Sequence, residues 1–494
     1  MSQPTGAPDP DSEYKLLIGG DWVAGGDGTY PIINPATEQV VGYAPNASVA
    51  DAEAAADAAA AAFPSWSRTS PDERAALLER AATLLDQRYH EFVPLVQAET
   101  GATLRVTKQM QVPMAAVRLR RYAKGIDPEL QIPVEPSIMP STALAPGGII
   151  GGLARRVPVG VVVCITSYNF PLTNMAGKVG PALAMGNTVI IKPAPQDPLG
   201  VIKLAEVFAD AGFPPGVVNF VVSEGPAPAE ALVASPKVDM ISFTGSTAVG
   251  QRIGAVAGGG MKRLLLELGG KGACIVFDDA DLRAAVTGIT SVWAFHSGQI
   301  CTAPTRVLAQ RGIYDQLVDG LKSAATRLKI GDPLDKETVV GPVITGAHRE
   351  RVEGYIASGR DEGGTIVTGG DRGGMDTGFY VAPTLIADCK PGMTVVQEEI
   401  FGPVIVVLPF DDTDEAVALA NSTDFGLYDY VYSKDSAKAF AVAQQLRTGN
   451  VGINTVQRNH EMPFGGFKKS GIGRDGGRFG FHAYSELQSI VWPG

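Results

Sequence analysis

The sequence predicts an α/β protein with two domains, each a parallel sheet covered by helices. From Val157 onward, short β-branched runs alternate with segments of helical composition, which is typical of a doubly wound sheet. A second series of such strands starts near Glu267. The length of 494 residues, with 45% hydrophobic and 19% charged residues, suits several buried cores and excludes disorder of most of the chain.

Two helices are expected before the first sheet. The segment 48–63 is rich in Ala and starts with Ser48 and Asp51, which are spaced like a capping box. Pro64 is expected to end this helix. The segment 71–88 carries four leucines at helical spacing, so it is expected to face a core.

The segment 126–156 is rich in Pro and Gly and contains several extended stretches. Together with the last strand-like residues of the chain, it predicts an arm of paired strands that reaches another subunit. A plain surface linker explains the same composition equally well. The sequence therefore leaves the role of this segment open.

The net charge of −11 makes nucleic acid and anionic membranes unlikely partners. The longest apolar stretches are shorter than the roughly 18 to 20 residues of a membrane span. The first residues lack the basic start and apolar core of a signal peptide, so a cytoplasmic protein is expected. The four cysteines are far apart and form no C-x-x-C pair; neither disulfides nor a metal site are expected.

Two glycine-containing segments are candidate nucleotide sites, and the second is the stronger candidate. The segment 471–476 matches G-x-G-x-x-G, but it follows no strand and opens no βαβ unit, so it is not interpreted as a cofactor site. At Gly245, an apolar strand turns into a helix whose first N–H groups could bind an anion. Gln251 stands where a P-loop would need Lys. An ordinary strand-to-helix turn is the alternative.

Three residues suggest covalent chemistry. Cys301 lies in a turn between a helix-like and a strand-like segment, where backbone donors could stabilise a thiolate. Glu267 ends an apolar strand before two glycines, and burial there would raise its pKa and suit it to general-base work. Asn169 follows another apolar strand and could donate to an oxyanion. A buried inert cysteine, a helix-capping carboxylate and a turn-forming Asn are the ordinary alternatives.

Seven segments resemble the aldehyde dehydrogenase superfamily in content and order: SYNFPL, VIIKPAP, FTGSTAVG, LLLELGGK, GQICTAP, EEIFGPV and PFGGFKKSGIGR. The resemblance covers residues 14–492. It implies a Rossmann-type cofactor domain (14–125 and 157–266), an α/β catalytic domain (267–475) and a small β oligomerisation arm (126–156 and 476–494). A homodimer or homotetramer is then expected.

The resemblance also implies roles for single residues. Cys301 would be the nucleophile and Glu267 the general base, while Asn169 and the backbone N–H of Cys301 would hold the oxyanion. Lys178 and Asp475 would assist proton removal behind Glu267. Because the family usually has Glu at the position of Asp475, the reach of that pair is shorter here.

For the cofactor, NAD or NADP, the resemblance implies that Lys192 bonds the adenine ribose. Gly245 and Ser246 would meet the pyrophosphate, and Glu399 and Phe401 the nicotinamide end. The remaining implied cofactor contacts are Ile165, Thr166, Pro193, Pro195, Val249 and Leu268. Since NAD-preferring members usually carry Glu where this chain has Pro195, NAD is expected to work and NADP to be tolerated.

The implied substrate pocket departs from the family in several places. Gly177 replaces a bulky aromatic, so a wider entrance is expected, and Asn174 adds polarity. Arg458 lies in a segment that is often apolar in relatives, which suggests an aldehyde that is bulky or carries an acceptor or carboxylate. Pairing of Arg458 with an acid at the rim is the alternative. The full expected pocket is Phe170, Asn174, Gly177, Ile300, Thr302, Arg458 and Phe464.

The expected reaction is oxidation of an aldehyde to a carboxylic acid through a thiohemiacetal and a thioester on Cys301. Transfer of the acyl group to coenzyme A is disfavoured, because relatives that do this generally lack the base found here at Glu267. A thiol esterase or hydrolase that pairs Cys301 with His296 is a further alternative, although no third, orienting group is evident.

Overall fold

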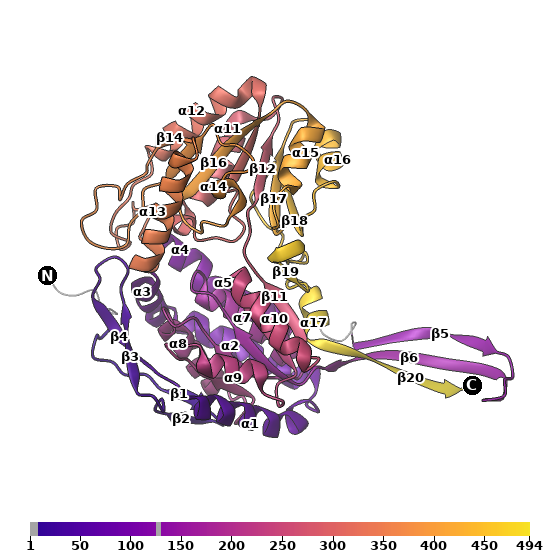
Figure 1. The fold of residues 1–494 in the computed structure, drawn as a ribbon. Helices are drawn as coiled ribbons and strands as arrows, with labels where there is room; N and C mark the ends of the chain where they lie inside the picture. Colours follow the sequence, from indigo (N-terminus) through magenta and orange to yellow (C-terminus); the bar gives the residue numbers. More distant parts are fainter. Residues whose placement is uncertain (1–7, 125–129) are drawn as a thin grey trace.

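The computed structural model describes residues 8–124 and 130–494. Figure 1 shows two α/β lobes, one above the other, and a narrow arm of strands that projects from the lower lobe. Within these described residues, no helix is both long and apolar enough to cross a membrane. The described residues also contain no cluster of three or more potential metal-ligating side chains.

The lower lobe is built on an eight-stranded sheet. Its order is β19 (Gly471–Ile472), β11 (Arg263–Glu267), β10 (Met240–Thr244), β7 (Val161–Ile165), β8 (Thr188–Lys192), β9 (Val218–Phe220), β1 (Leu16–Ile18) and β2 (Asp21–Val23). The run from β11 to β9 is parallel. Strands β7 and β8 are buried throughout, because helices cover both faces of such a sheet.

The helices of this lobe are largely those that periodicity indicates. They are α1 (Val49–Trp66), α2 (Pro71–Gln87), α3 (Tyr89–Thr100), α4 (Leu104–Val106), a π-helical turn (Thr107–Gln111), α5 (Val112–Ala123), α7 (Pro171–Ala184), α8 (Leu199–Asp210), α9 (Ala227–Ala234) and α10 (Thr247–Gly259). A separate two-stranded sheet, β3 (Thr29–Ile33) with β4 (Val40–Pro45), lies near the N-terminus.

Helix α1 has the predicted capping box between Ser48 and Asp51, but it does not end at Pro64. The helix continues through Pro64 to Trp66. The Trp66 ring is buried, and its Nε1 donates to the carbonyl of Asn187 at 3.0 Å. A proline in the last turn forfeits one intrahelical hydrogen bond, and the burial of Trp66 offsets that loss. The predicted end was therefore wrong by three residues.

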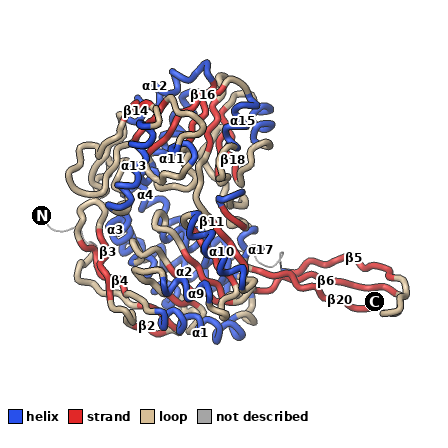
Figure 2. The backbone as a smooth tube through the Cα atoms, viewed as in Figure 1, coloured by secondary structure: helices blue, strands red, loops and turns tan. Residues whose placement is uncertain are grey.

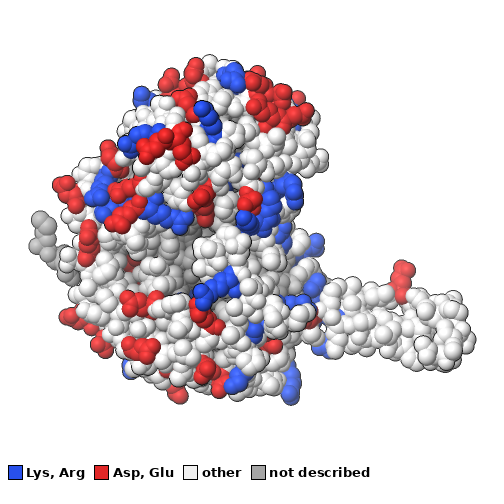
Figure 3. All heavy atoms as spheres, viewed as in Figure 1, with Lys and Arg blue, Asp and Glu red and all other residues white. Residues whose placement is uncertain are grey.

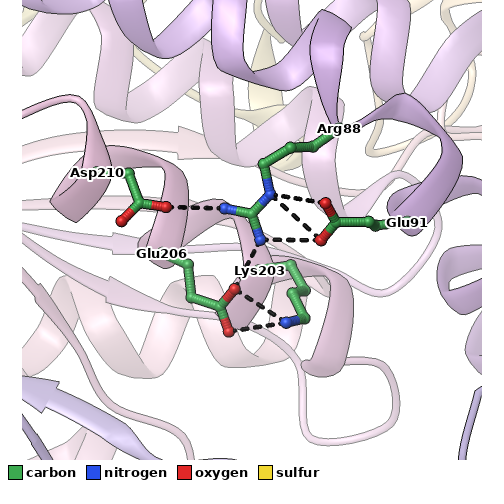
Figure 4. Close-up of polar contacts among 5 residues, drawn as sticks. All are labelled: Arg88, Glu91, Lys203, Glu206 and Asp210. Atoms are coloured by element: carbon green, nitrogen blue, oxygen red, sulfur yellow. Dashed lines mark hydrogen bonds and ion pairs between the residues drawn. The ribbon is translucent and has the colours of Figure 1, made fainter.

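An ion-pair network on the lower lobe ties the junction of α2 and α3 to α8 (Figure 4). The guanidinium of Arg88 contacts Glu206 at 2.8 Å, and Glu91 and Asp210 at 3.0 Å. Lys203 adds a bond of 2.9 Å to Glu206. Because these groups are partly exposed, each pair contributes about 1 kcal/mol or less.

The upper lobe holds a seven-stranded sheet. Its order is β14 (Thr365–Thr368), β15 (Thr384–Ala387), β16 (Val404–Phe410), β13 (Arg306–Gln310), β12 (Ala273–Val276), β17 (Tyr428–Tyr432) and β18 (Asn450–Ile453). All neighbours are parallel except β14 and β15. The helices of this lobe are α11 (Leu282–Trp293), α12 (Tyr314–Ala325), α13 (Gly346–Asp361), α14 (Thr394–Gln397), α15 (Thr413–Asn421) and α16 (Ser436–Ala443).

Strand β19 crosses the expected domain boundary. The segment 267–475 was assigned to the catalytic domain, yet Gly471 and Ile472 pair antiparallel with Glu267 and Leu266 in the sheet of the lower lobe. The G-x-G-x-x-G match therefore starts in an edge strand. Helix α17 (Phe479–Ala483) follows it and leads into the arm.

The arm is a three-stranded antiparallel sheet in the order β20 (Ser485–Pro493), β6 (Gly148–Pro158) and β5 (Gln131–Met139). The predicted pairing of the C-terminal strand with this segment is thus observed (Figure 2). Residues 126–129 of the expected arm lie outside the described residues. The arm carries few charged side chains on the face seen in Figure 3. In the single chain Ile138 is 84% exposed and Leu144 98% exposed.

Candidate active site

One cavity of about 460 Å³ collects most of the predicted site residues. It is lined by the loop that follows β7, by the β10–α10 turn and by the end of β11, which all lie at the carboxyl edge of the lower sheet. The upper lobe contributes Ile300, Cys301, Thr302, Ile344, Thr345, Ala347, His348, Arg351, Glu399, Phe401, Arg458 and Phe464. Ligands of open parallel sheets bind at this edge.

At one end of the cavity, strand β10 passes through Gly245 and Ser246 into helix α10. The Ser246 side chain accepts a hydrogen bond from the Val249 N–H and caps the helix. A Cβ atom on Gly245 would lie 2.4 Å from the Phe243 ring, so the ring or the turn would have to shift to accept a side chain there. The helix dipole and the remaining free N–H groups favour an anion here.

Glu399 and Phe401 line the same cavity. The Glu399 carboxylate accepts from the Gly270 N–H at 2.8 Å, and burial raises its pKa to about 7. Phe401 has a φ of +59° and packs edge-on against Tyr168 and His348. The His348 ring contacts the Phe401 carbonyl at 2.7 Å. His348 belongs to no motif that the sequence analysis singled out.

Seven predicted residues do not line this cavity: Ile165, Thr166, Lys192, Pro193, Pro195, Val249 and Gly177. The Lys192 ammonium instead donates to the Pro193 carbonyl at 3.0 Å, and burial lowers its pKa to about 8. Gln196, which the sequence analysis missed, does line the cavity, and its buried Oε1 has no hydrogen-bond partner among the described residues. Gln196 directly follows Pro195, which the sequence analysis placed at the cofactor, and this neighbourhood could have identified it.

Cys301 is partly accessible and lines the cavity, whereas Cys164, Cys274 and Cys389 are buried. Burial has the largest effect on the pKa of the Cys301 thiol, although a backbone hydrogen bond at Cys301 lowers this pKa, in the direction that the sequence predicts. Burial raises the pKa of the Cys301 thiol to about 12, and the carboxylates of Glu399 and Glu267 act in the same direction. The positive charge of Arg458 partly opposes this shift. The sulfur therefore needs a proton acceptor before it can attack a carbonyl.

Asn169 is buried beside the cysteine loop. Its Nδ2 donates to the Gln299 carbonyl at 2.9 Å, and its Oδ1 accepts from Ser167 Oγ at 2.8 Å and from the Phe170 N–H at 3.1 Å. These bonds fix the amide next to residues 300–302. An amide nitrogen carries two hydrogens, so one remains for a group in the cavity.

Glu267 ends β11, and its two carboxylate oxygens are buried without a hydrogen-bond partner among the described residues. Burial raises the pKa of Glu267 well above its usual value, and Asp475 adds to the rise. A carboxyl group with a raised pKa that shares a cavity with a thiol is suited to proton transfer.

The expected pair of Lys178 and Asp475 is not a direct ion pair, since none within 4.0 Å joins them among the described residues. The Lys178 ammonium donates to Ser242 Oγ at 3.1 Å, and Asp475 Oδ1 accepts from the Gly476 N–H at 2.6 Å. Both residues nevertheless line the cavity. Burial lowers the pKa of Lys178, while the charges of Asp475 and Glu267 raise it. Because an aspartate side chain is shorter than a glutamate, the carboxylate of Asp475 interacts with the Lys178 ammonium only through longer-range electrostatic attraction.

Six of the seven residues expected in the substrate pocket line the same cavity: Phe170, Asn174, Ile300, Thr302, Arg458 and Phe464. Gly177 does not widen the entrance. A Cβ atom there would lie 2.3 Å from Nη1 of Arg118, so the guanidinium of Arg118 fills the space that the glycine leaves. Arg118 itself lines the cavity and was missed, because it lies on helix α5, 59 residues earlier in the chain.

Arg458 has no carboxylate within 4.0 Å among the described residues, so the alternative of an ion pair at the rim was wrong. Its guanidinium lies 3.9 Å from the centre of the Phe464 ring. Such stacking holds a cation without neutralising it.

His296 gives no support to a hydrolase. It is buried, does not line the cavity, and packs against the Phe170 ring at 5.4 Å between centroids. Burial lowers the pKa of His296 to about 4. A hydrolase would need this ring beside the sulfur.

These features define an α/β enzyme class in which one cysteine, one buried carboxyl group and a nucleotide-type turn share a cavity between two lobes. The family model described as "Aldehyde dehydrogenase family" matches residues 22–490. The chain belongs to the aldehyde dehydrogenase family. The predicted family, fold class and reaction class are thereby confirmed.

Named relatives cover almost the whole chain. The phenylacetaldehyde dehydrogenase of Pseudomonas fluorescens is 36% identical over 97% of this chain and 95% of its own length. The betaine aldehyde dehydrogenase of Cereibacter sphaeroides is 39% identical over 93% of each chain. A betaine aldehyde dehydrogenase from Staphylococcus aureus, solved with NAD+, superposes with a TM-score of 0.92 at 34% identity and covers 97% of this chain and 94% of its own.

Proposed function

We propose that this protein oxidises an aldehyde to a carboxylic acid with NAD or NADP, and that Cys301 is the nucleophile. The observation that carries the proposal is the shared cavity: Cys301, the unpartnered carboxyl group of Glu267 and the Gly245–Ser246 turn all line it. The Staphylococcus aureus relative binds NAD+, which supports the same cofactor here.

The residues present fit a dinucleotide. The free N–H groups at the start of α10 suit the pyrophosphate, and the buried Glu399 carboxylate suits ribose hydroxyls. Gln196 offers an unpaired amide oxygen in the same cavity. When bound, the oxidised nicotinamide accepts a hydride. Because Pro195 carries no charge, it would not repel the 2′-phosphate of NADP.

The chain's own residues account for the rest of the chemistry. Glu267, directly or through a water molecule, takes the proton of the Cys301 thiol as the sulfur bonds to the aldehyde carbon. The alkoxide that forms accepts hydrogen bonds from the Asn169 amide and the Cys301 N–H, and each such donor lowers the barrier by about 3 kcal/mol. After loss of hydride, the carbon remains as a thioester on Cys301.

Glu267 first releases the thiol proton to solvent. It then removes a proton from water, whose oxygen bonds to the thioester carbon while the bond to sulfur breaks, and the departing thiolate takes up that proton. The products are the carboxylic acid and the regenerated thiol. Lys178 and Asp475 would tune Glu267 through their charges, since both act on its pKa. Neither is in hydrogen-bond contact with it among the described residues.

The test is reduction of NAD and of NADP by a panel of aldehydes. We expect Cys301→Ala to abolish oxidation and to leave nucleotide binding, measured by calorimetry, unchanged. Cys389→Ala is the matched control, because Cys389 is buried under β15 away from the cavity. Continued NAD reduction by Cys301→Ala would refute the assignment.

We propose further that the arm joins subunits in a homodimer or homotetramer. Its exposed apolar side chains and scarcity of charge support this role. Light scattering should show that Ile138→Lys lowers the mass of the assembly. Met261→Lys, which changes a side chain that is 87% exposed outside the arm, should leave it unchanged. The four cysteines are free, which supports a reducing compartment such as the cytoplasm.

A further inference from the structure

Two arginines at the substrate end of the cavity have no acidic partner. Arg118 comes from α5 and Arg458 from the loop that follows β18, and both line the cavity that contains Cys301. Arg118 donates to the Thr173 carbonyl at 2.8 Å. Neither guanidinium lies within 4.0 Å of a carboxylate among the described residues. Both arginines are partly buried, and a positive charge that is removed from water is usually paired.

The nearby acids are already engaged or lie at the reacting centre. Glu461 forms an ion pair with Arg121, and Asp475 accepts from the Gly476 N–H. Burial raises the pKa of Glu267 well above its usual value, and this carboxyl group lies at the reacting centre. Burial and the neighbouring charge of Arg118 both lower the pKa of Arg458. Asp475 lines both cavities with the two arginines but lies within 4.0 Å of neither guanidinium among the described residues, so the two positive charges repel each other without a direct ion pair to offset them.

A second, smaller cavity of about 90 Å³ shows where these arginines lie. Arg118, Arg458 and Phe464 line both cavities, whereas Gly245, Glu399 and Phe401 line only the larger one. The arginines are thus at the end away from the nucleotide turn. The charge of Arg458 still reaches the sulfur, because it lowers the pKa of Cys301 against the effect of burial.

Two neighbouring residues, Gly177 and Phe464, accommodate the side chains of Arg118 and Arg458. Gly177 leaves space for Arg118, since a Cβ atom at position 177 would lie 2.3 Å from Nη1 and the guanidinium would have to move. The Phe464 ring supports Arg458 from one face. Gly177 in α7 and Arg458 after β18 therefore contribute to the same local feature, a positively charged pocket wall.

We propose that the physiological substrate is an aldehyde that carries a carboxylate at its far end, and that Arg458 and Arg118 bind this carboxylate while the carbonyl carbon reaches Cys301. The inference deepens the proposed function and rests on it. A planar guanidinium matches a carboxylate with two parallel hydrogen bonds. The substrate would supply the negative charge that the pocket lacks.

The test compares aldehydes that differ only in the charge of the far end. Suitable pairs are succinic semialdehyde and its methyl ester, glutaric semialdehyde and its methyl ester, and 4-carboxybenzaldehyde and methyl 4-formylbenzoate. We expect kcat/KM of the wild type to favour the acid of at least one pair by about tenfold or more. Added salt should weaken only the preference for the acid.

Arg458→Gln should lower kcat/KM for the acid by about 10- to 100-fold and for the ester by less than about threefold. Arg458→Lys should restore part of the loss, because it returns the charge without the planar fork. Gly177→Ala should act in the same direction as Arg458→Gln, since it displaces Arg118. Arg311→Gln is the matched control: Arg311 is exposed and pairs with Asp411 away from the cavity.

A readout without turnover guards against loss of fold. Glutarate should bind the wild type, by calorimetry, more tightly than it binds Arg458→Gln, while melting temperatures stay similar. Equal kcat/KM for acids and esters, or an equal loss for both in Arg458→Gln, would overturn the inference and leave the proposed function standing. Failure to oxidise any of the six aldehydes with either cofactor would overturn the proposed function, and the inference with it.

Discussion

The two ends of the cavity differ in the groups that line them, which are mainly backbone groups at one end and mainly side chains at the other. The cofactor end depends on backbone: a glycine turn, the capped start of α10 and the Gly270 N–H. The substrate end depends on side chains, with Arg118 from the lower lobe and Arg458 and Phe464 from the upper lobe. The backbone N–H groups of the turn are kept as long as Gly245 allows its conformation, whereas the arginines of the substrate end change with single substitutions. The contrast explains how one fold could keep its cofactor and change its aldehyde.

The largest effect is expected where the two ends meet, at Glu267. Glu267→Gln keeps the shape of the side chain but removes the base, so kcat should fall by about 10³-fold. In the wild type, kcat should rise with pH through the raised pKa of Glu267 and fall as pH drops below it, because only the carboxylate accepts a proton. The variant should lose this dependence.

Steady-state kinetics between about pH 5 and 9 would measure this effect, because a carboxyl group with a raised pKa titrates within that range. Glu230→Gln is the matched control, because Glu230 pairs with Arg252 on the surface. An unchanged pH profile in Glu267→Gln would show that another group acts as the base. In that case Glu267 would not be the residue that links the cofactor end of the cavity to the substrate end.

A smaller effect should be confined to the cofactor end. Gly245→Ala places a Cβ atom against the Phe243 ring, so we expect the turn to shift. The N–H groups at the start of α10 would then no longer point toward the pyrophosphate. We expect KM for the nucleotide to rise about tenfold, the equivalent of one weakened hydrogen bond to a charged group. KM for the aldehyde should change little.

Gly254→Ala in the same helix is the control, since a Cβ atom there meets nothing within 4 Å. An equal rise of both KM values in Gly245→Ala would mean that the two ends are not independent. The comparison would then fail even if both sites were correctly assigned.

The smallest effect is expected at Pro195, beside the cofactor end. Pro195→Glu adds a negative charge that should repel the 2′-phosphate of NADP and raise the ratio of kcat/KM for NAD over NADP about fivefold. Pro195→Gln has the same shape without the charge and should leave the ratio near that of the wild type. A similar shift in both variants would show that charge is not the cause.

Local patterns in the sequence predicted what local interactions determine. The capping box of Ser48 and Asp51 and the glycine turn at Gly245 were found because their partners are a few residues away. The end of α1 was missed because the burial of Trp66 against Asn187, far along the chain, outweighs the effect of Pro64. Tertiary contacts of this kind leave no local signal.

The candidate site follows the same division. Cys301, Glu267 and Asn169 lie in motifs at strand or loop ends, and the structure brings them to one cavity. The exchange of space between Gly177 and Arg118 could not be predicted, because it joins helices α7 and α5. Likewise, no pattern in the sequence states that the aspartate at position 475 is too far from Lys178 for an ion pair.

Strand β19 makes the lower sheet discontinuous in the chain. Its edge at Glu267 is completed by Gly471 and Ile472, which follow the entire upper lobe. During synthesis, the nucleotide lobe therefore waits for about 200 further residues before its outer edge can close. Until then that edge exposes unpaired backbone groups. A nascent chain of this protein therefore carries an unpaired edge at β11 until Gly471 and Ile472 have been made.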